Sequence, residues 1–309
     1  MKKIRHAAIV GMGALGLLYG EKILHHIGPE ALSFVAEEDR IRKYQQMHFT
    51  VNGEPVCFPL QTAESASPAD LVLVAVKGPA LEAALQTMQA LIGPDTILLS
   101  VMNGITSEEI LGARYGKERI LGCVAQGMDA VKFGGDLTYS KPGELRIGIL
   151  PGGHPDKLKA VEEFLTRAQI AYTEEADIRF RLWGKFMLNV GINQTCMAYE
   201  TNYGGALTPG EAYETLIGAM RETIQIANLE GIALTEQDLE GYVALIRTLS
   251  PTGCPSMRQD GIAHRHSEVE LFSGTICRLA AKHGVSVPVN TRLYQTIRTM
   301  EESWEVPNA

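Results

Sequence analysis

A chain of 309 residues, 45% hydrophobic and 21% charged, has the composition of a globular protein and is long enough for two domains. Its formal net charge of -8, without a clustered basic stripe, argues against a nucleic-acid partner. No apolar run approaches the roughly 20 residues that a membrane span needs, and no signal-peptide pattern precedes the first strand, so we expect a cytoplasmic protein with no membrane partner.

The first informative stretch runs from Ala7 to Gly20, where a short apolar run predicts a strand and an apolar-periodic segment predicts a helix. The turn between them fits the pattern G-x-G-x-x-G. In that pattern the first glycine permits a tight turn, the second lets a pyrophosphate approach the backbone, and the third lets the helix pack against the strand. We therefore predict a dinucleotide site at Gly11, Met12, Gly13, Ala14, Leu15 and Gly16.

A second short strand is predicted over Leu32 to Val35, and charged residues follow it. An acidic side chain about 20 residues beyond the glycines usually accepts the ribose hydroxyls of NAD, whereas an arginine there favours the extra phosphate of NADP. Glu37 indicates NAD and Arg40 indicates NADP. The residues thus leave both cofactors open.

Two further apolar runs, Leu71 to Val76 and Thr96 to Val101, are typical of strands covered on both faces. Lys77 follows the first run and Asn103 follows the second. Because ligands of open α/β sheets bind beyond the carboxyl ends of the strands, both residues are candidates for contact with a cofactor or substrate. Alternatively, Lys77 is a solvated loop residue and Asn103 belongs to an ordinary turn.

The remaining elements of the first half are expected to complete the sheet. Asn52-Gly53 predicts a hairpin between residues 49–51 and 56–58. We also expect an antiparallel pair of residues 137–139 with 145–149, strands at 120–124 and 170–173, and an amphipathic helix at 156–168. Strands that alternate with helices predict a Rossmann-type, doubly wound domain over residues 1–175.

From Asp177 onward helical periods prevail, which predicts an all-helical domain over residues 176–309 and the α/β class for the whole chain. In the helix predicted for residues 181–199, Lys185, Asn189 and Asn193 form one polar row within roughly 80° of the helical wheel. Buried polar groups need partners, so the row indicates a polar ligand site. The alternative is a solvent-facing stripe.

Ser256 and Glu268 belong to the next informative segment. Ser256 with Gln259 fits a capping box, so the simplest role for this serine is a helix cap. On a 3.6-residue wheel Glu268 shares an apolar face with Phe272. A carboxylate there needs a cation or a donor, and Lys185 is available.

The cysteines and histidines give no sign of a metal. The five cysteines are scattered without a C-x-x-C pair, and we expect reduced thiols. His264 and His266 lack a third ligand at suitable spacing. We therefore predict no metal site.

Six segments recur together in a known family: GMGALG from Gly11, VAVK ending at Lys77, MNG around Asn103, LWGKFMLNVGIN around Lys185, SMRQD from Ser256 and HSEVE around Glu268. In order and rough spacing, along essentially the whole chain, they resemble the ketopantoate reductase family (2-dehydropantoate 2-reductases). Many dehydrogenases share the glycine pattern. The K-x-x-x-N-x-x-x-N helix with the later S-M-x-Q-D segment is much more specific.

The resemblance implies NADPH-dependent reduction of 2-dehydropantoate to (R)-pantoate, in pantothenate and coenzyme A synthesis, by a monomer or homodimer. It implies that Lys185 is the general acid that protonates the ketone oxygen. Asn103 would touch both substrate and cofactor, Glu268 would lie beside Lys185 where the two meet, and Met128 would meet the cofactor. The substrate's hydroxyl and carboxylate would be held by Asn189, Asn193 and Ser256.

The chain departs from the family at three places. Glu37 stands where the family often has arginine, which keeps NAD(H) possible beside NADP(H). A further substrate-binding asparagine of the family falls near Tyr203, one residue from Asn202, and Gln194 replaces a frequent proline. A reductase of another 2-oxo acid, a 3-hydroxy acid or 6-phosphogluconate-type dehydrogenase, and a non-catalytic NAD(P) sensor stay open as alternatives.

Overall fold

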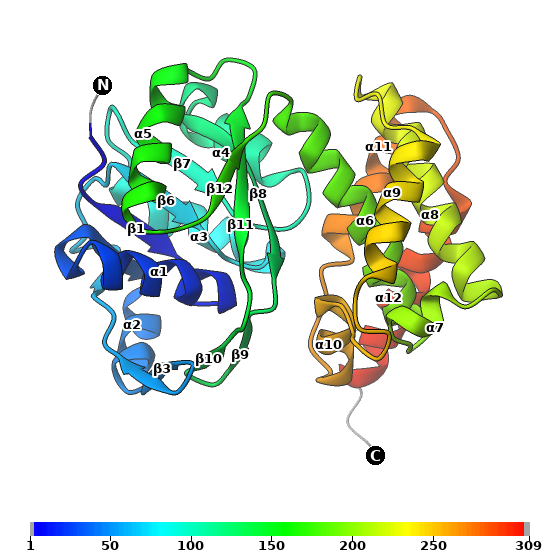
Figure 1. Cartoon of the computed structure of the whole chain (residues 1–309), viewed down its shortest axis with the longest axis horizontal. Coiled ribbons are helices and arrows are strands. Elements are labelled where there is room, and N and C mark those ends of the chain that lie inside the picture. The colour runs from blue at the N-terminus through cyan, green and yellow to red at the C-terminus, as the bar shows by residue number, and fades with distance from the viewer. Residues whose placement is uncertain (1–2, 306–309) are drawn as a thin grey trace. The chain divides into compact units, whose positions relative to one another are not determined.

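The computed structural model describes residues 3–305, so the first two and last four residues of the predicted domain ranges lie outside it. The chain divides into two compact units, residues 1–181 and 182–309. The first unit contains all the described strands, with helices on both faces of its main sheet, and the described part of the second is helical (Figure 1). The predicted combination of an N-terminal Rossmann-type sheet and a helical C-terminal part is confirmed. Within residues 3–305 no helix has the length and apolar character of a membrane span.

The main sheet of the first unit has eight strands in the order β12-β11-β8-β7-β6-β1-β2-β5. All neighbours run parallel except β8 and β11. From β5 to β8 this order is that of a dinucleotide-binding fold, and it reverses direction at β1. The strands are β1 (Ala7–Val10), β2 (Leu32–Ala36), β5 (Leu60–Thr62), β6 (Leu71–Val74), β7 (Ile97–Ser100), β8 (Ile120–Met128), β11 (Pro142–Ile149) and β12 (Tyr172–Glu174).

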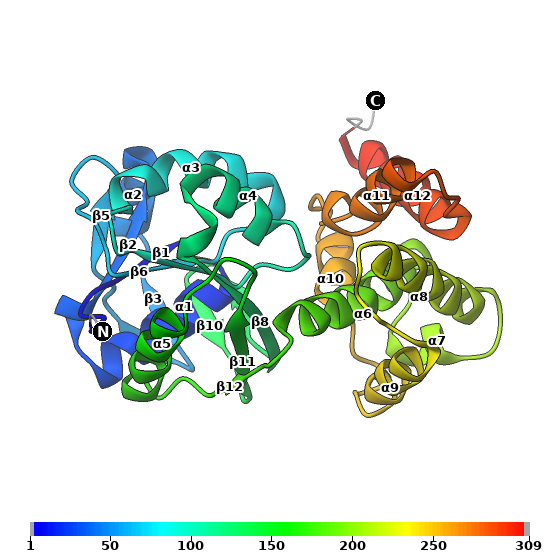
Figure 2. The same cartoon turned by 90° about the horizontal axis from the view of Figure 1, so that it is seen from above.

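Alternate side chains of the central strands bury themselves on opposite faces of the sheet. Ile9 and the other side chains on the same face of the sheet pack against α1 (Ala14–His26) and α5 (Pro155–Arg167). Val10 and its equivalents pack against α3 (Leu81–Met88), and Figure 2 shows α2, α3 and α4 on this second face. The short helices α2 (Glu38–Gln45), α4 (Ser107–Tyr115), η1 (Pro29–Ala31), η2 (Gly78–Ala80), η3 (Gln89–Leu91) and η4 (Lys117–Arg119) complete the connections.

A second sheet of four strands, ordered β4-β3-β10-β9, packs beside α1. Its strands are β3 (Phe49–Val51), β4 (Glu54–Val56), β9 (Val131–Phe133) and β10 (Asp136–Thr138). The hairpin turn at Asn52-Gly53 is confirmed, with φ angles of 50° and 87° that suit a tight hairpin turn. The range predicted for its second strand, 56–58, is wrong, because residues 54–56 directly after the two-residue turn are the ones that pair with β3.

The predicted pairing of residues 137–139 with 145–149 is wrong. β10 pairs with β3 and β9, whereas β11 pairs antiparallel with β8 over seven register positions from Leu121 to Met128. Alternating hydrophobicity identifies a strand but does not name its partner, because the partner is chosen by packing between distant segments.

The described part of the second unit consists of helices, and the first of them, α6 (Ile178–Ala198), begins in the last residues of the first unit. Its predicted range of 181–199 is confirmed within a few residues. The segment Glu270–Gly274 (η5) is a π-helix that leads directly into α11 (Thr275–His283). The other helices are α7 (Tyr203–Leu207), α8 (Glu211–Leu229), α9 (Glu236–Arg247), α10 (Ser256–Ile262) and α12 (Pro288–Glu305).

Candidate functional site

The three glycines after β1 are held in place for different reasons. Gly11 has φ +111°, and a Cβ on it would lie 2.5 Å from the carbonyl oxygen of Ala75. A Cβ on Gly16 would collide with the carbonyl oxygen of Gly11. At Gly13 the nearest atom would be 3.7 Å away, an ordinary contact. The fold therefore requires glycine at positions 11 and 16, whereas at 13 the space is open.

The start of α1 fits a pyrophosphate. Gly13 is its N-cap, and within the described residues 3–305 no side chain is found to accept from the first N–H groups of the helix. Gly13 is also exposed, which leaves the backbone accessible from outside. Free N–H groups at the positive end of a 13-residue helix are a known way of binding phosphate. Ala14 and Leu15 form its first turn.

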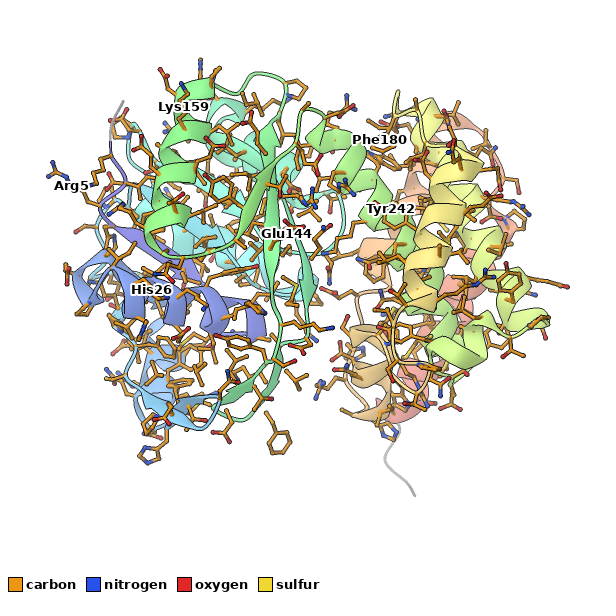
Figure 3. The ribbon with its side chains drawn as sticks, in the orientation of Figure 1. Arg5, His26, Glu144, Lys159, Phe180 and Tyr242 are labelled. Atoms are coloured by element: carbon orange, nitrogen blue, oxygen red, sulfur yellow. The ribbon has the colours of Figure 1, made fainter. Side chains whose placement is uncertain are left out.

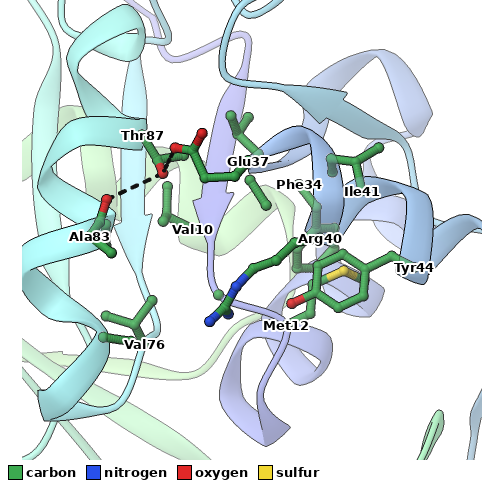
Figure 4. A pocket seen from close by; sticks show the side chains of 15 residues that line it. Val10, Met12, Phe34, Glu37, Arg40, Ile41, Tyr44, Val76, Ala83 and Thr87 are labelled. Carbon is green, nitrogen blue, oxygen red and sulfur yellow. Dashed lines mark hydrogen bonds between the residues drawn. The ribbon is translucent and has the colours of Figure 1, made fainter.

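A pocket lies beyond the carboxyl ends of β1, β2 and β6 (Figure 4). Of the predicted cofactor residues, Gly11, Met12, Glu37 and Arg40 line it. Sequence reasoning missed the residues that α2, α3 and the end of β6 contribute, because a single threonine or alanine inside a helix gives no ligand signal. The missed lining residues include Tyr44, Val76, Ala83 and Thr87.

The carboxylate of Glu37 is bound to a neighbouring helix. The Thr87 hydroxyl donates to Glu37 Oε1 at 2.7 Å, and the carbonyl oxygen of Ala83 lies farther from the same hydroxyl, at 3.4 Å. Figure 4 shows the Arg40 side chain crossing the pocket with its guanidinium turned away from this carboxylate. Glu37 and Arg40 thus occupy different parts of one pocket.

Three other predicted cofactor residues stand at or just beyond the ends of neighbouring strands. Lys77 is exposed and precedes η2, after β6. Asn103 is half-buried in the loop after β7, and Met128 is the last residue of β8. All three stand at the carboxyl edge of the parallel strands, but none of them lines the pocket of Figure 4.

In the second unit the polar row of α6 is largely buried. Asn189 and Asn193 are 8% and 6% exposed, and Lys185 is half-buried. Gly184 permits α6 to pack closely on α9, because a Cβ there would collide with the hydroxyl of Tyr242 (labelled in Figure 3). The row is therefore carried by a tightly packed helix.

Hydrogen bonds fix which way both asparagine amides point. The backbone N–H of Met257 can only donate, and it donates to Asn193 Oδ1 at 3.3 Å. Asn193 Nδ2 then donates to Asn189 Oδ1 at 3.1 Å. No further hydrogen bond of the Asn189 side chain is found within residues 3–305, so its amide nitrogen is left as a donor. A group that binds here must supply an acceptor, such as a carboxylate or carbonyl oxygen.

The prediction that Ser256 caps a helix is wrong. α10 begins at Ser256 itself, with Pro255 in the N-cap position and no side-chain cap. The first-turn N–H of Met257 is satisfied by Asn193 of α6 instead. The Ser256 hydroxyl also donates to Asn193 Oδ1, at 3.4 Å. A partner distant in sequence has replaced the local capping box.

Glu268 is 9% exposed and precedes the π-helical segment, while Glu270 is exposed. The predicted wheel position is confirmed, because Glu268 is buried together with Phe272, whose N–H bonds to the Glu268 carbonyl oxygen at 3.2 Å. The wider turn comes only in the π-helical segment that follows. On the N-terminal side of the π-helical segment, the Glu301 carboxylate accepts from both the N–H and the hydroxyl of Ser267, at 2.8 and 2.5 Å. The far end of the segment is held by Gln194 of α6, whose Oε1 accepts from the Ser273 N–H at 3.0 Å.

Asn202, Tyr203 and His264, which the sequence also singled out, have defined surroundings. Asn202 caps α7 by accepting from the Gly205 N–H at 2.9 Å. Burial raises the pKa of Tyr203 to about 12. His264 stacks on Trp304. The side chain of Asn202 therefore serves as the N-cap of α7.

Two family profiles match the chain, one in each half. The profile described as "Ketopantoate reductase PanE/ApbA" matches residues 7–152, and "Ketopantoate reductase PanE/ApbA C terminal" matches residues 177–301. The chain belongs to the ketopantoate reductase family. Its glycine turn lies in the first matched region, and the polar row, Ser256 and Glu268 lie in the second. The family reduces with a nicotinamide dinucleotide.

Relatives match along the whole chain at low identity. The 2-dehydropantoate 2-reductase of Streptococcus pyogenes serotype M6 is 23% identical and that of Aquifex aeolicus 25%, each over 95% of this chain and over 97% and 96% of its own length. Among solved structures, D-mandelate dehydrogenase with NADH and anilino(oxo)acetate has a TM-score of 0.86 at 22% identity, over 97% of this chain and 100% of that one. A ketopantoate reductase from Ralstonia eutropha JMP134 has 0.83 at 21%, with the same coverage.

Proposed function

We propose that the protein reduces the 2-oxo group of 2-dehydropantoate to give (R)-pantoate, with a nicotinamide dinucleotide as the reductant. The observation that carries this proposal is the Asn189 donor beside Lys185 on α6, since such a pair suits the carboxylate and the carbonyl of a 2-oxo acid. Membership of the ketopantoate reductase family supports the same reaction.

Each residue has a defined task in this proposal. The dinucleotide, when bound, supplies hydride from C4 of its nicotinamide to C2 of the substrate. The Lys185 ammonium donates a proton to the ketone oxygen as the carbon–oxygen double bond becomes a single bond, so the product is an alcohol. Asn189, Asn193 and Ser256 hold the carboxylate and hydroxyl, and Asn103 and Glu268 contact cofactor or substrate.

The dinucleotide is proposed to lie along the carboxyl edge of the parallel strands. Its pyrophosphate would meet the residues from Gly11 to Gly16 at the start of α1. Its adenosine would occupy the pocket with Glu37 and Arg40, and Lys77 and Met128 would contact it farther along the sheet.

A second candidate is reduction of an aromatic 2-oxo acid. One observation favours it: the D-mandelate dehydrogenase structure, which contains anilino(oxo)acetate, has the high TM-score of 0.86. Homodimer formation is likewise a proposal, supported by a dimeric ketopantoate reductase from Staphylococcus aureus with a TM-score of 0.81 at 20% identity, over 97% of this chain and 99% of that one.

The assay that separates these candidates follows the loss of reduced nicotinamide absorbance. Ketopantoate and phenylglyoxylate are offered side by side at equal concentration, each with NADH and with NADPH. We expect kcat/KM to be highest for ketopantoate. A higher value for phenylglyoxylate would favour the second candidate, and no turnover of any 2-oxo acid would contradict the proposed function altogether.

The role of Lys185 is tested by Lys185→Ala. We expect kcat to fall by at least about 100-fold, because loss of a general acid typically costs 10² to 10⁴. Binding of the dinucleotide, measured by calorimetry, should change little. Lys159→Ala, which removes an exposed lysine of α5 (Figure 3), is the matched control. A Lys185→Ala enzyme with the wild-type rate would exclude this role.

A further inference from the structure

The pocket of Figure 4, which we propose holds the adenosine, contains a hydrogen-bond donor that no sequence motif indicates. Thr87 is 4% exposed, inside α3, and its hydroxyl donates to Glu37 Oε1 at 2.7 Å. A threonine hydroxyl has one hydrogen, and the competing acceptor, the Ala83 carbonyl, is 3.4 Å away. The charged and nearer acceptor forms the stronger bond. Thr87 therefore fixes the position of the Glu37 carboxylate.

We infer that Thr87, by holding Glu37 at the edge of this pocket, makes the protein select NADH over NADPH. The inference rests on the proposed nicotinamide-dependent function and adds the residue that decides the cofactor. Oε1 is occupied by Thr87, while no hydrogen bond of Oε2 is found within residues 3–305. Oε2 is thus available to accept from the ribose hydroxyls of NADH.

A fixed carboxylate also excludes the phosphate of NADPH. An unrestrained glutamate has a long, flexible side chain that can turn into solvent when a negatively charged group approaches. Because Thr87 is buried and retains its bond to Oε1, turning away requires breaking a charge-assisted hydrogen bond. The 2′-phosphate and the carboxylate would then repel each other at close range.

The charges at the start of α2 favour the same cofactor. Glu38 and Asp39 occupy its first turn, where the positive end of the helix would otherwise attract a phosphate. Arg42 pairs with Glu38 at 2.5 Å. Arg40 is the only cation among the described lining residues, and its guanidinium is turned away from Glu37 (Figure 4). The surroundings of Glu37 therefore provide little positive charge to offset the repulsion between its carboxylate and a 2′-phosphate.

The test measures dissociation constants of NADH and NADPH by calorimetry, without any 2-oxo acid. For the wild type we expect NADH to bind at least about tenfold more tightly, which corresponds to one hydrogen bond to a charged group. Thr87→Val keeps the shape and removes the donor, and it should narrow that ratio by about threefold to tenfold. Thr87→Ser keeps the hydroxyl and is the matched control, which should retain the wild-type ratio.

Glu37→Gln provides a second variant on the other side of the bond. It removes the charge but keeps an acceptor for Thr87, so NADPH should bind more tightly than it binds to the wild type. Melting temperatures without ligand verify that each variant is folded. A wild type that prefers NADPH, or a Thr87→Val variant with an unchanged ratio, would overturn the inference.

Binding and turnover separate this inference from the proposed function. If no 2-oxo acid is reduced but the ratio of dissociation constants shifts as expected, the proposed reaction is wrong and the role of Thr87 stands. If ketopantoate is reduced equally well with both cofactors and Thr87→Val has no effect on either dissociation constant, the reaction stands and the role of Thr87 is wrong.

Discussion

At the scale of single residues, the three glycines of one motif have separable physical roles. Gly11 and Gly16 are needed by the chain itself, because a Cβ on either would meet backbone atoms. At Gly13 the surroundings leave ordinary van der Waals space for a methyl group. A side chain at position 13 should thus weaken binding of the ligand and leave the stability of the fold nearly unchanged.

Gly13→Ala is therefore expected to leave the melting temperature nearly unchanged and to weaken dinucleotide binding by about tenfold or more, because the methyl group occupies the approach of the pyrophosphate. Calorimetric titration with NADH and a thermal melt measure the two effects. Gly11→Ala serves as the contrasting variant, since it should lower stability before any ligand is added. Equal loss of stability in both variants would refute this division of roles.

At the scale of elements, the π-helical segment depends on a side chain of α6. Val269 O accepts from Gly274 N, five residues ahead, at 3.0 Å. The Ser273 N–H, which an α-helix would direct to Val269 O, bonds to Gln194 Oε1 instead, and Gln194 Nε2 donates to Val190 O at 2.7 Å. Gln194 is completely buried, so it joins the segment after Glu268 to the helix of Lys185.

Gln194→Met keeps the length of the side chain and removes both hydrogen bonds. We expect kcat for the 2-oxo acid to fall about tenfold, since a buried N–H left without an acceptor costs about 1 to 3 kcal/mol and the segment carrying Glu268 should loosen. Hydrogen exchange of residues 267–275 should become faster.

The neighbouring residue supplies the control for this experiment. Thr195 is equally buried on α6, and within residues 3–305 its hydroxyl has no hydrogen-bond partner. Thr195→Val should leave both kcat and exchange unchanged. Glu230→Gln, which weakens an ion pair elsewhere in the second unit, tests whether lost stability alone lowers kcat. If Gln194→Met behaves like Thr195→Val, the segment does not depend on Gln194.

At the scale of the whole molecule, acid stability depends on carboxylates with strong partners. Glu230, at the end of α8, lies 2.6 Å from Lys282 Nζ and 2.5 Å from His283 Nε2 of α11. The hydrogen bond from Lys282, followed by that from His283, holds the pKa of Glu230 below its ordinary value of 4.5. A lowered pKa contributes stability above that ordinary value, and the contribution is lost as pH falls through the folded-state pKa.

Glu230→Gln should accordingly lower the free energy of unfolding at pH 7 by roughly 1 to 2 kcal/mol. The difference from the wild type should shrink as pH falls below the ordinary value of 4.5. Urea unfolding at a series of pH values measures it. Glu236→Gln is the control, because the Arg221–Glu236 pair is more than half exposed on both sides and should contribute less. A pH-independent difference would argue against this account.

The amino-acid sequence by itself determined the class of fold and the order of its parts. Glycine spacing, apolar runs and helical periods are local properties, and they predicted β1, β2, β6, β7 and the long helix α6. The same patterns placed Glu37, Asn103 and Lys185 on the elements that carry them. Local patterns succeed here because backbone geometry repeats every two residues in strands and every 3.6 residues in helices.

Only the tertiary structure decided which distant groups meet. It paired β11 with β8, supplied Asn193 in place of a helix cap for α10, and set the wider turn after Glu268. It also brought Thr87 to Glu37, 50 positions apart in the chain. These contacts depend on packing between segments far apart in sequence, for which a residue's neighbours along the chain carry no information. The physical basis proposed for choosing between NADH and NADPH therefore lies in a contact that no local motif contains.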